Sequence, residues 1–259
     1  MANKQPLILI TNDDGITAPG ILHLIAIAKT ISNQIYVVAP DKPQSGMGHA
    51  ITINAMLRIQ PFQMDGVTAF SCTGTPVDCV KLAISKVVPR TPDLILSGVN
   101  HGSNSSINVI YSGTMSAAVE GAIEGVPSIG FSLCDHSIDA YFAPTGPYIK
   151  QIIEFALKNK MEKHTCWNVN FPSISSELIK GIRVCRQARA VWEEEFQERQ
   201  DPSGKPYYWL TGKFVNHEPD REDTDEWALS QGYISLVPVQ YDVTAYHVID
   251  QIKGLENEK

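Results

Sequence analysis

The chain has 259 residues and a formal net charge of −7 at pH 7, with 43% hydrophobic and 19% charged residues. This length can bury the core of one large α/β domain. The negative charge argues against a nucleic-acid polymer or an anionic membrane as the main partner. A small phosphorylated ligand stays possible, because local charge and a metal ion can outweigh the average.

Strand and helix patterns alternate through the first two thirds of the chain. The expected strands cover residues 7–11, 34–39, 93–97 and 128–132, and the expected helices cover residues 19–31, 75–88 and 112–124. Shorter alternating segments at residues 51–53, 57–62 and 68–72 are expected to form antiparallel strands. The main strands are continuously apolar, which is typical of a parallel sheet covered by helices on both faces.

The last third of the chain has a different pattern. A helix at residues 147–159 and a strand at residues 165–170 are followed by a polar segment rich in aromatic residues, residues 192–231. Within it, the run EEEFQERQDPSGKP predicts a hairpin arm with its turn at residues 201–204. Its aromatic side chains need cover, from a partner subunit or from the same subunit. A final strand is expected at residues 232–238 and a final helix at residues 243–252.

The cysteines and the N-terminus predict where the protein resides. Five cysteines are scattered without a C-x-x-C pair, which is typical of free thiols in a reducing compartment, and Cys72 and Cys79 are expected to be packed. The N-terminal apolar run is too short for a signal peptide. No segment approaches the roughly 20 apolar residues that span a bilayer. We therefore expect a cytoplasmic protein with no membrane partner.

Three polar loops follow predicted apolar strands. They are Asn12-Asp13-Asp14-Gly15, PDKPQSGMGHA at residues 40–50, and SGVNHGSNSS at residues 97–106. Loops at the carboxyl ends of parallel strands lie at one edge of the sheet, where ligands usually bind. We therefore expect these loops to meet in space although they lie far apart in the sequence.

Asp13 and Asp14 are adjacent carboxylates at the end of an apolar strand. Such a pair resists burial because the charges repel each other and lose their hydration. A divalent cation would stabilise both, and carboxylate, hydroxyl and amide oxygens suit a hard ion such as Mg²⁺, Mn²⁺ or Ca²⁺. The alternative is a turn in which an Asp side chain caps the next helix. The spacing excludes an EF-hand, which needs oxygen ligands at every second position and a later glutamate.

The segment YSGTMSAAVEGAIEG at residues 111–125 places Ser112, Gly113 and Thr114 at the start of a predicted helix. Free backbone N–H groups and the helix dipole favour an anion there, and small side chains would let a phosphate approach. The alternative is an ordinary N-cap followed by close helix packing through alanine and glycine. Neither the P-loop pattern nor the dinucleotide-binding pattern G-x-G-x-x-G occurs in the chain.

His49 and His101 lie in two of the polar loops. Either histidine could donate a hydrogen bond to a phosphate or act as an acid. Loop histidines are also commonly exposed to solvent without a role, and the sequence leaves both interpretations open.

Taken together, these segments resemble the SurE (survival protein E) family of metal-dependent nucleoside-monophosphate phosphatases. The resemblance depends on an ordered set of motifs, each weak alone, that covers nearly the whole chain. They are TNDDG at 11–15, PQSGMGHAIT at 43–52, TGTPVDCV at 73–80, SGVNHGSN at 97–104, YSGTMSAAVEG at 111–121 and VQYDVTAY at 239–246.

The resemblance implies a Rossmann-like, three-layer α/β core with a mostly parallel sheet over residues 1–190. Residues 191–259 would form a β-hairpin arm, a final strand and a helix, exchanged between the subunits of a homodimer or tetramer. The implied activity is hydrolysis of nucleoside 5′- or 3′-monophosphates and, in some members, of short polyphosphate. One divalent metal ion such as Mg²⁺ or Mn²⁺ is implied in each subunit.

The resemblance also implies the residues of the site. The implied metal ligands are Asp13, Asp14, Ser45 and Asn100. The implied surroundings of the phosphate are Asn12, Gly46, Asn104, Ser112, Gly113 and Thr114. Asp13 and Asp14 are the candidate catalytic residues, and the nucleophile is a metal-activated water or, as the alternative, an aspartate carboxylate.

Three positions depart from the family pattern. Ser106 replaces a usual glycine and is expected to narrow or reshape the loop behind Asn104. Met115 replaces a usual valine and is expected only to repack its helix. Tyr246 stands where some relatives carry histidine, so we assign it no catalytic role.

Two other functions would use the same residues. A phosphometabolite-binding sensor would use the metal pocket without turnover, and a structural Ca²⁺ site would be stabilised by Ca²⁺ without phosphatase activity. The dense set of polar oxygen ligands favours catalysis over capture alone.

Overall fold

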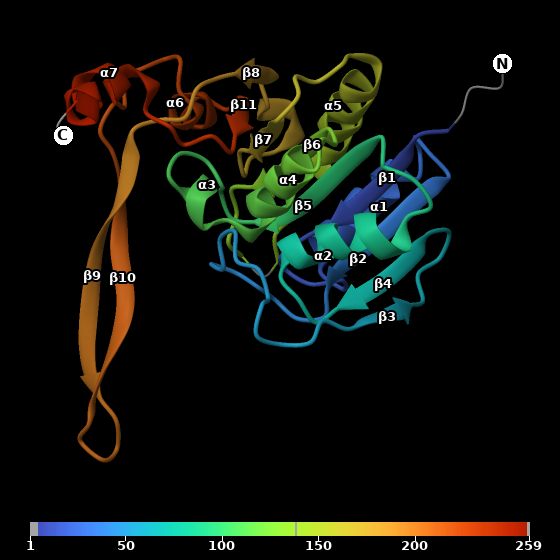
Figure 1. Ribbon diagram of the computed structural model, residues 1–259, viewed down its shortest axis with the longest axis horizontal. Coiled ribbons are helices and arrows are strands. Elements are labelled where there is room, and N and C mark those ends of the chain that lie inside the picture. The colour runs from blue at the N-terminus through green and yellow to red at the C-terminus, as the bar shows by residue number, and fades with distance from the viewer. Residues whose placement is uncertain (1–4, 138, 258–259) are drawn as a thin grey trace.

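The computed structural model describes residues 5–137 and 139–257 (Figure 1). Their central element is a mixed nine-stranded sheet in the order β3-β4-β2-β1-β5-β6-β7-β11-β8. Its strands are β1 (Leu7–Thr11), β2 (Gln34–Pro40), β3 (Ile59–Phe62), β4 (Thr68–Cys72), β5 (Leu94–His101), β6 (Ser128–Leu133), β7 (Thr165–Phe171), β8 (Ile182–Val184) and β11 (Ile234–Gln240). A separate antiparallel hairpin consists of β9 (Ala190–Gln200) and β10 (Pro206–Asn216).

Helices cover both faces of the sheet, as the apolar strands predict. The α-helices are α1 (Pro19–Ala28), α2 (Pro76–Leu82), α3 (Asn108–Tyr111), α4 (Gly113–Ile123), α5 (Gly146–Lys158), α6 (Asp225–Ser230) and α7 (Ile249–Ile252). Helices α1 and α5 pack on one face, and α2 and α4 pack on the other. Successive side chains of a strand point to opposite faces, so Ile8 and Ile10 belong to the first core and Leu9 to the second.

The parallel strands reverse their winding at β1 and β5. Strands β1, β2, β4, β5, β6 and β7 are parallel to their neighbours in this set. Counted along the chain, these six have the spatial order 3-2-1-4-5-6 of a doubly wound α/β fold. The chain leaves β1 and β5 toward opposite sides of the sheet, which opens a crevice at their carboxyl ends.

Two predicted elements are wrong in extent or kind. Residues 51–53 form no strand, because the Thr52 N–H and hydroxyl bond to the carboxylate of Asp78 instead of to a neighbouring strand. The helix expected over residues 243–252 is α-helical only in α7, with a 3₁₀ turn at Tyr246–Val248 before it.

Other boundaries shift for local reasons. The helix predicted over residues 19–31 ends at Ala28, because Thr30 and Ile31 donate to carbonyls three residues earlier and tighten the last turn. Strand β5 continues past residue 97, because Asn100 and His101 resume pairing with β6 after an irregularity. The predicted strand at 57–62 begins at Ile59, and β3 and β4 are antiparallel to each other as expected, although β4 is parallel to β2. The short elements α3, α6 and β8 were not predicted, because so few residues carry no periodic pattern.

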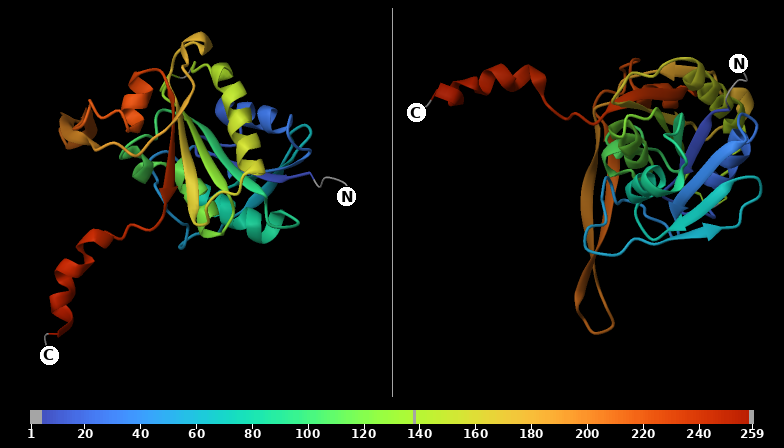
Figure 2. Two further views of the ribbon diagram at one scale, coloured as in Figure 1. Left: turned by 90° about the horizontal axis from the view of Figure 1, so that it is seen from above. Right: turned by 45° about the vertical axis from the view of Figure 1, so that its right-hand side comes forward.

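The hairpin and the C-terminal segment, residues 241–257, both project from the body of the molecule (Figure 2). The hairpin turn lies at the predicted position, where the Asp201 side chain accepts hydrogen bonds from the N–H groups of Ser203 and Lys205. Both projections expose large apolar side chains, namely Phe196, Trp209, Leu210, Val243, Ile252 and Leu255. Among the described residues, no helix is long and apolar enough to cross a membrane.

Candidate active site

A cleft of about 480 Å³ lies where the loops after β1, β2 and β5 meet the root of the hairpin. Six of the predicted site residues line it: Asp13, Ser45, Gly46, Asn100, Asn104 and Ser112. Hydrogen bonds join the loops, since Gln44 N–H donates to the Asp13 carbonyl at 2.8 Å and Gly48 N–H to the Tyr111 carbonyl at 3.2 Å. The structure therefore brings together three loops that are far apart in the sequence.

Asp13 is a buried carboxylate at the wall of this cleft, with only 4% of its surface exposed. The Thr114 hydroxyl donates to Asp13 Oδ1 at 2.5 Å, and a Cβ on Gly113 would lie 2.7 Å from Asp13 Cβ. Burial raises the pKa of Asp13 to about 6, against the opposing Thr114 hydrogen bond and with an added contribution from the Asp14 charge. An anion at this position is costly unless a cation compensates it.

Asp14 lies beside the cleft rather than in its lining. Its Oδ2 is 3.3 Å from both the backbone nitrogen and Nδ1 of His101. The His101 ring does line the cleft, and its other neighbour is Phe142, whose ring centroid is 4.9 Å away in an edge-to-face arrangement. His101 is thus held between a carboxylate and an aromatic ring.

The donor set suits a hard divalent cation. The amide nitrogen of Asn100 donates to the carbonyls of His101 and Gly102, both at 2.9 Å, which leaves the amide oxygen available as a ligand. Together with the Ser45 hydroxyl and the two aspartates, this gives two carboxylates and two neutral oxygens. Within the described part of the chain, no three His, Cys, Asp or Glu side chains form a metal-binding group. Such a site would therefore depend on neutral oxygen ligands and water.

Three buried polar atoms around the carboxyl end of β1 and the adjacent part of β5 have no hydrogen-bond partner among the described residues. They are Thr11 Oγ1, Asn12 Oδ1 and Ser97 Oγ. Thr11 and Ser97 are paired across the two strands, and the Asn12 amide nitrogen donates to the Gly15 carbonyl at 2.9 Å. Asn12 is not part of the cleft lining. Unpaired buried polar groups are rare in folded proteins and mark this strand end as specialised.

Ser112 caps α4 at the edge of the cleft. Its hydroxyl accepts a hydrogen bond from Met115 N–H at 3.0 Å, and Gly113 and Thr114 pack against Asp13 behind it. The start of this 11-residue helix therefore faces the same cleft as Asp13. Backbone N–H groups at such a position favour an anion.

His49 lies away from the cleft lining, although it belongs to the loop that carries Ser45. Its Nε2 is 2.9 Å from Oε2 of Glu120, which is 3% exposed on α4. The other oxygen of Glu120 accepts from the Lys81 ammonium at 2.7 Å. His49 thus connects its loop to α4.

A buried asparagine network holds Asn104. Asn104 N–H donates to Asn170 Oδ1 and the Asn104 amide to Ser132 Oγ, while Asn168 donates to the Asn104 carbonyl, each at 2.8 Å. Asn170 in turn donates to Asn168 Oδ1 at 2.9 Å. Sequence reasoning missed Asn168 and Asn170, although two asparagines within an otherwise apolar strand were a usable signal.

Ser106, which is expected to narrow or reshape the loop behind Asn104, does not itself line the cleft. The residue is buried with φ of 53°, the left-handed conformation that favours glycine. Its hydroxyl donates to the carbonyls of Ala188 at 2.9 Å and Ala190 at 3.1 Å. The serine therefore links the loop behind Asn104 to the root of the hairpin.

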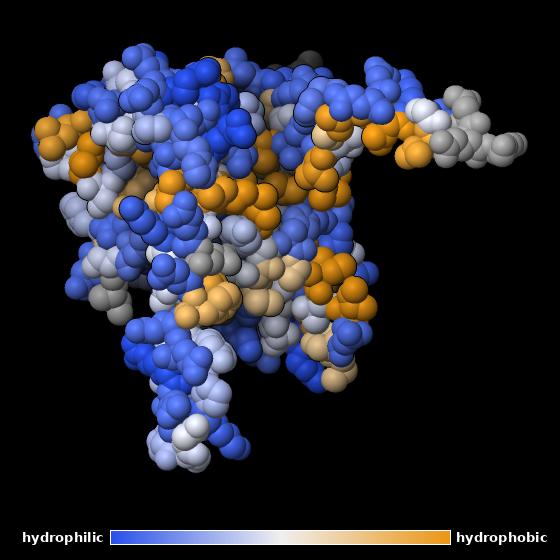
Figure 3. Space-filling view, turned by 90° about the vertical axis from the view of Figure 1, so that its left-hand side faces the viewer, coloured by the Kyte–Doolittle hydropathy of each residue, from blue (hydrophilic) through white to orange (hydrophobic). Residues whose placement is uncertain are grey.

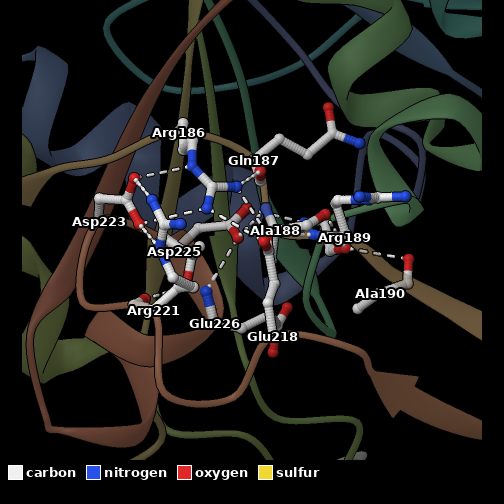
Figure 4. A network of polar contacts seen from close by, with 12 residues as sticks. Arg186, Gln187, Ala188, Arg189, Ala190, Glu218, Arg221, Asp223, Asp225 and Glu226 are labelled. Atoms are coloured by element: carbon white, nitrogen blue, oxygen red, sulfur yellow. Dashed lines mark hydrogen bonds and ion pairs between the residues drawn. The ribbon is translucent and has the colours of Figure 1, made fainter.

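A charged network fixes the root of the hairpin on the body of the protein (Figure 4). Arg186 donates to Glu218 Oε1 at 2.6 Å and to Asp223 Oδ2 at 2.9 Å, and these bonds lower the pKa of both carboxyls to about 2. Asp225 accepts from the N–H groups of Ser106 at 2.8 Å and Ala188 at 2.9 Å. The hairpin root and the loop behind Asn104 thus share one set of anchors.

The cleft lining also contains residues that the sequence did not indicate. They are Ser103, Ser105, Asn108, Tyr111, His136, Trp192, Phe214 and Glu226. His101, one of the two candidate histidines, also lines the cleft. Trp192 and Phe214 belong to the aromatic-rich segment of the sequence, but only the fold places them in the lining of the same cleft as Asp13.

The comparisons with known proteins agree in family and fold. A family model described as survival protein SurE matches residues 8–194. A 5′-nucleotidase SurE from Flavobacterium psychrophilum is 58% identical over 258 residues, which is 99% of this chain and 100% of the relative. One from Flavobacterium johnsoniae is 59% identical over 254 residues, 97% of each chain. A crystal structure of the SurE protein from Aquifex aeolicus aligns with a TM-score of 0.84 at 37% identity, covering 97% of this chain and 100% of that one.

Proposed function

The chain belongs to the survival protein SurE family, and from this premise we propose that it is a 5′-nucleotidase that releases phosphate from nucleoside 5′-monophosphates. The relatives that carry this activity in their names match it over nearly its whole length. The observation that supports the proposal most directly is Asp13, a buried carboxylate at the switch point of the sheet that faces the same cleft as the start of α4.

One divalent ion such as Mg²⁺ or Mn²⁺ would be held in each subunit by Asp13, Asp14, Ser45 and Asn100. When bound, the ion supplies positive charge for the phosphoryl oxygens and lowers the pKa of a water molecule. The raised pKa of bare Asp13 and the oriented Asn100 amide support this ligand set.

The protein's own residues would position the phosphate. Gly46, Asn104 and Ser112 line the cleft, and the backbone N–H groups at the start of α4 stabilise negative charge there. Gly113 packs closely on Asp13, and the Thr114 hydroxyl donates a hydrogen bond to the Asp13 carboxylate. Asn12 contributes by holding the turn after β1, through its bond to Gly15.

We propose water as the nucleophile, with the carboxylate of Asp14 as the alternative. If Asp14 attacked, a labelled phosphate would become covalently attached to the enzyme during turnover. The proposal extends to nucleoside 3′-monophosphates and short polyphosphate, because all of these substrates present a terminal phosphoryl group to the same residues.

The exposed apolar surface and the cysteines bear on the assembly and location of the protein. We propose a homodimer or tetramer in which residues 191–259 contact another subunit, because the hairpin and the C-terminal segment expose apolar side chains. We propose a cytoplasmic location because all five cysteines are free thiols.

Phosphate release from AMP with Mg²⁺ or Mn²⁺ tests the function. The Asp13→Asn variant should lose at least about 10²-fold in kcat, because it removes charge where the ion and phosphate meet, and should bind Mn²⁺ more weakly in calorimetry. The matched variant Asp65→Asn changes an exposed aspartate outside the cleft lining and should behave as the wild type. AMP binding without turnover by the wild-type protein with either metal would favour the sensor instead, and full activity of Asp13→Asn would refute the site.

A further inference from the structure

Resting on the proposed function, we propose that Tyr111, Trp192 and Phe214 form a stacking platform for the nucleobase of the substrate. The β9–β10 hairpin, which carries two of these rings, would then be a substrate-binding element as well as a projection from the fold. These three rings line the cleft and are not among the proposed phosphate and metal residues.

The platform belongs to the same cleft as the phosphate residues. Asp13, Asn104 and Ser112 line this cleft together with Tyr111, Trp192 and Phe214. A second cavity of about 460 Å³ shares Gly46, Asn108, Tyr111 and Trp192 with it and continues along β10 past Leu210, Thr211 and Gly212. A ligand whose phosphate lies at Ser112 therefore has an aromatic surface available for its other end.

The Trp192 ring is held in place by its neighbours. Its Nε1 donates to Asn108 Oδ1 at 2.7 Å, and its ring centroid lies 5.5 Å from that of Phe214, directly across the hairpin ladder, with an interplanar angle of 61°. The side chain nevertheless remains 44% exposed. A fixed and partly exposed ring is ready to stack on a planar ligand without first losing conformational freedom.

The platform is also fixed relative to the phosphate residues. The Ala190 carbonyl, two residues before Trp192, accepts the Ser106 hydroxyl, and Asp225 ties Ser106 to Ala188. The distance between platform and phosphate residues is therefore set by hydrogen bonds, as recognition of a ligand with two ends requires.

The chemistry of the platform indicates broad recognition of bases. Stacking on aromatic rings is tolerant of base identity because every base has a π face. The Asn108 oxygen is already engaged by Trp192, so hydrogen-bond readout of the base is reduced. We expect purine nucleotides to bind more tightly than pyrimidine nucleotides, because the larger ring system stacks over more of the platform.

Two substrates separate the base from the phosphate in the test. AMP carries both, whereas ribose 5-phosphate carries the sugar and phosphate without a base. In the full-length Trp192→Leu protein, KM for AMP should rise about 10-fold or more with little change in kcat. KM for ribose 5-phosphate should stay within about twofold of the wild-type value, and Trp192→Phe should restore most of the AMP affinity.

A control variant comes from the same hairpin. Trp209 is 57% exposed and lines neither cavity, so Trp209→Leu should leave the kinetics of both substrates unchanged. The mass of each variant, measured by light scattering after size-exclusion chromatography, shows whether the assembly is preserved.

The outcomes distinguish this inference from the proposed function. Equal losses for AMP and ribose 5-phosphate in Trp192→Leu, or no loss for either, would overturn the platform, and equal losses with a reduced mass would assign these rings to a contact between copies of the chain. If the wild type hydrolyses neither substrate, the proposed function fails, and calorimetric binding then decides the inference. In that case Trp192→Leu should weaken AMP binding and spare ribose 5-phosphate, and equal weakening of both would overturn the platform.

Discussion

At the scale of single residues, Ser106 shows a side chain compensating for an unfavourable backbone conformation. Its φ of 53° is one that glycine adopts without cost and that a Cβ makes strained by about 1–2 kcal/mol. The single hydroxyl hydrogen is shared between the carbonyls of Ala188 and Ala190, and a hydrogen bond of this kind contributes about 1 kcal/mol. In a conformation that favours glycine, the serine thus adds a link to the hairpin root.

Two substitutions at this position should separate the strain from the hydrogen bond. Ser106→Ala loses the shared hydrogen bond and keeps the strain, whereas Ser106→Gly loses the hydrogen bond and relieves the strain. We expect both variants to be less stable than the wild type. The free energy of unfolding of the alanine variant should be lower than that of the glycine variant by about 0.5–1 kcal/mol, a figure that includes the greater conformational freedom of glycine in the unfolded chain. Urea unfolding followed by tryptophan fluorescence measures the difference. An alanine variant as stable as the wild type would show that this hydrogen bond contributes nothing.

At the scale of secondary-structure elements, Glu120 joins three parts of the fold. From α4 it contacts Lys81 on α2 and His49 in the loop that carries Ser45. Burial opposes its ionisation, but the hydrogen bonds from His49 and Lys81 outweigh that effect and lower the pKa of Glu120 below 4.5. The carboxylate therefore supports the position of the loop without touching the cleft.

Glu120→Gln should destabilise the protein in a pH-dependent way. A carboxyl whose pKa is lowered by folding stabilises the folded state above its unfolded pKa of about 4.5, and this contribution is lost as the pH falls through the folded pKa. At pH 7 we expect a loss of about 1–2 kcal/mol, reduced from a fully buried pair because His49 and Lys81 are partly exposed. The gap to the wild type should narrow as the pH falls below 4.5 and through the lowered pKa of folded Glu120, as measured by urea unfolding across this range.

The matched control is Glu124→Gln. Glu124 is more exposed and its carboxylate is 3.5 Å from the same Lys81 ammonium, so its removal should cost less than about 0.5 kcal/mol at pH 7. A stability gap for Glu120→Gln that stays constant from pH 7 to pH 3.5 would contradict an electrostatic origin.

At the scale of the whole molecule, the exposed apolar surface indicates association. Figure 3 shows hydrophobic residues in a band across one face and along the underside of the C-terminal segment. The exposed side chains of this segment include Val243 at 95%, Ile252 at 61% and Leu255 at 71%. Surfaces of this kind mark protein contacts in soluble proteins.

We predict that charges placed on this segment reduce the size of the assembly. The wild type should elute with a mass of two or more chains of 28.5 kDa, and Ile252→Asp combined with Leu255→Asp should shift it to a smaller species, because burying a carboxylate in an apolar contact is costly. Gln251→Asp adds a charge at an exposed polar position of the same segment and should leave the mass unchanged. Light scattering after size-exclusion chromatography measures all three, and a monomeric wild type would contradict the prediction.

Much of the fold could be predicted because its signals are local. Strands β1 and β4 have the expected bounds, since a run of apolar or alternating residues between turn signals needs no knowledge of its neighbours. Helix α2 begins where Thr75 and Pro76 predict, with a capping box formed within four residues. The strand predicted at residues 51–53 was wrong because the signal was not local: Thr52 donates its hydrogen bonds to Asp78, which lies 26 residues away.

The features of the candidate site also divide into those that local sequence patterns predict and those that depend on the tertiary structure. By itself the sequence determined that polar loops follow apolar strands, and it predicted that these loops hold the oxygen ligands of a cation and the hydrogen-bond donors for a phosphate. Only the tertiary structure decided that Asp13 is buried and accepts a hydrogen bond from Thr114, 101 residues away. It also decided that His49 bonds to Glu120 on α4 and does not line the cleft, and that Trp192 donates a hydrogen bond to Asn108, 84 residues away. The reason is physical: hydrogen-bonding capacity and hydrophobic period belong to each residue, whereas burial, pKa and partner depend on strand register and on packing between distant segments.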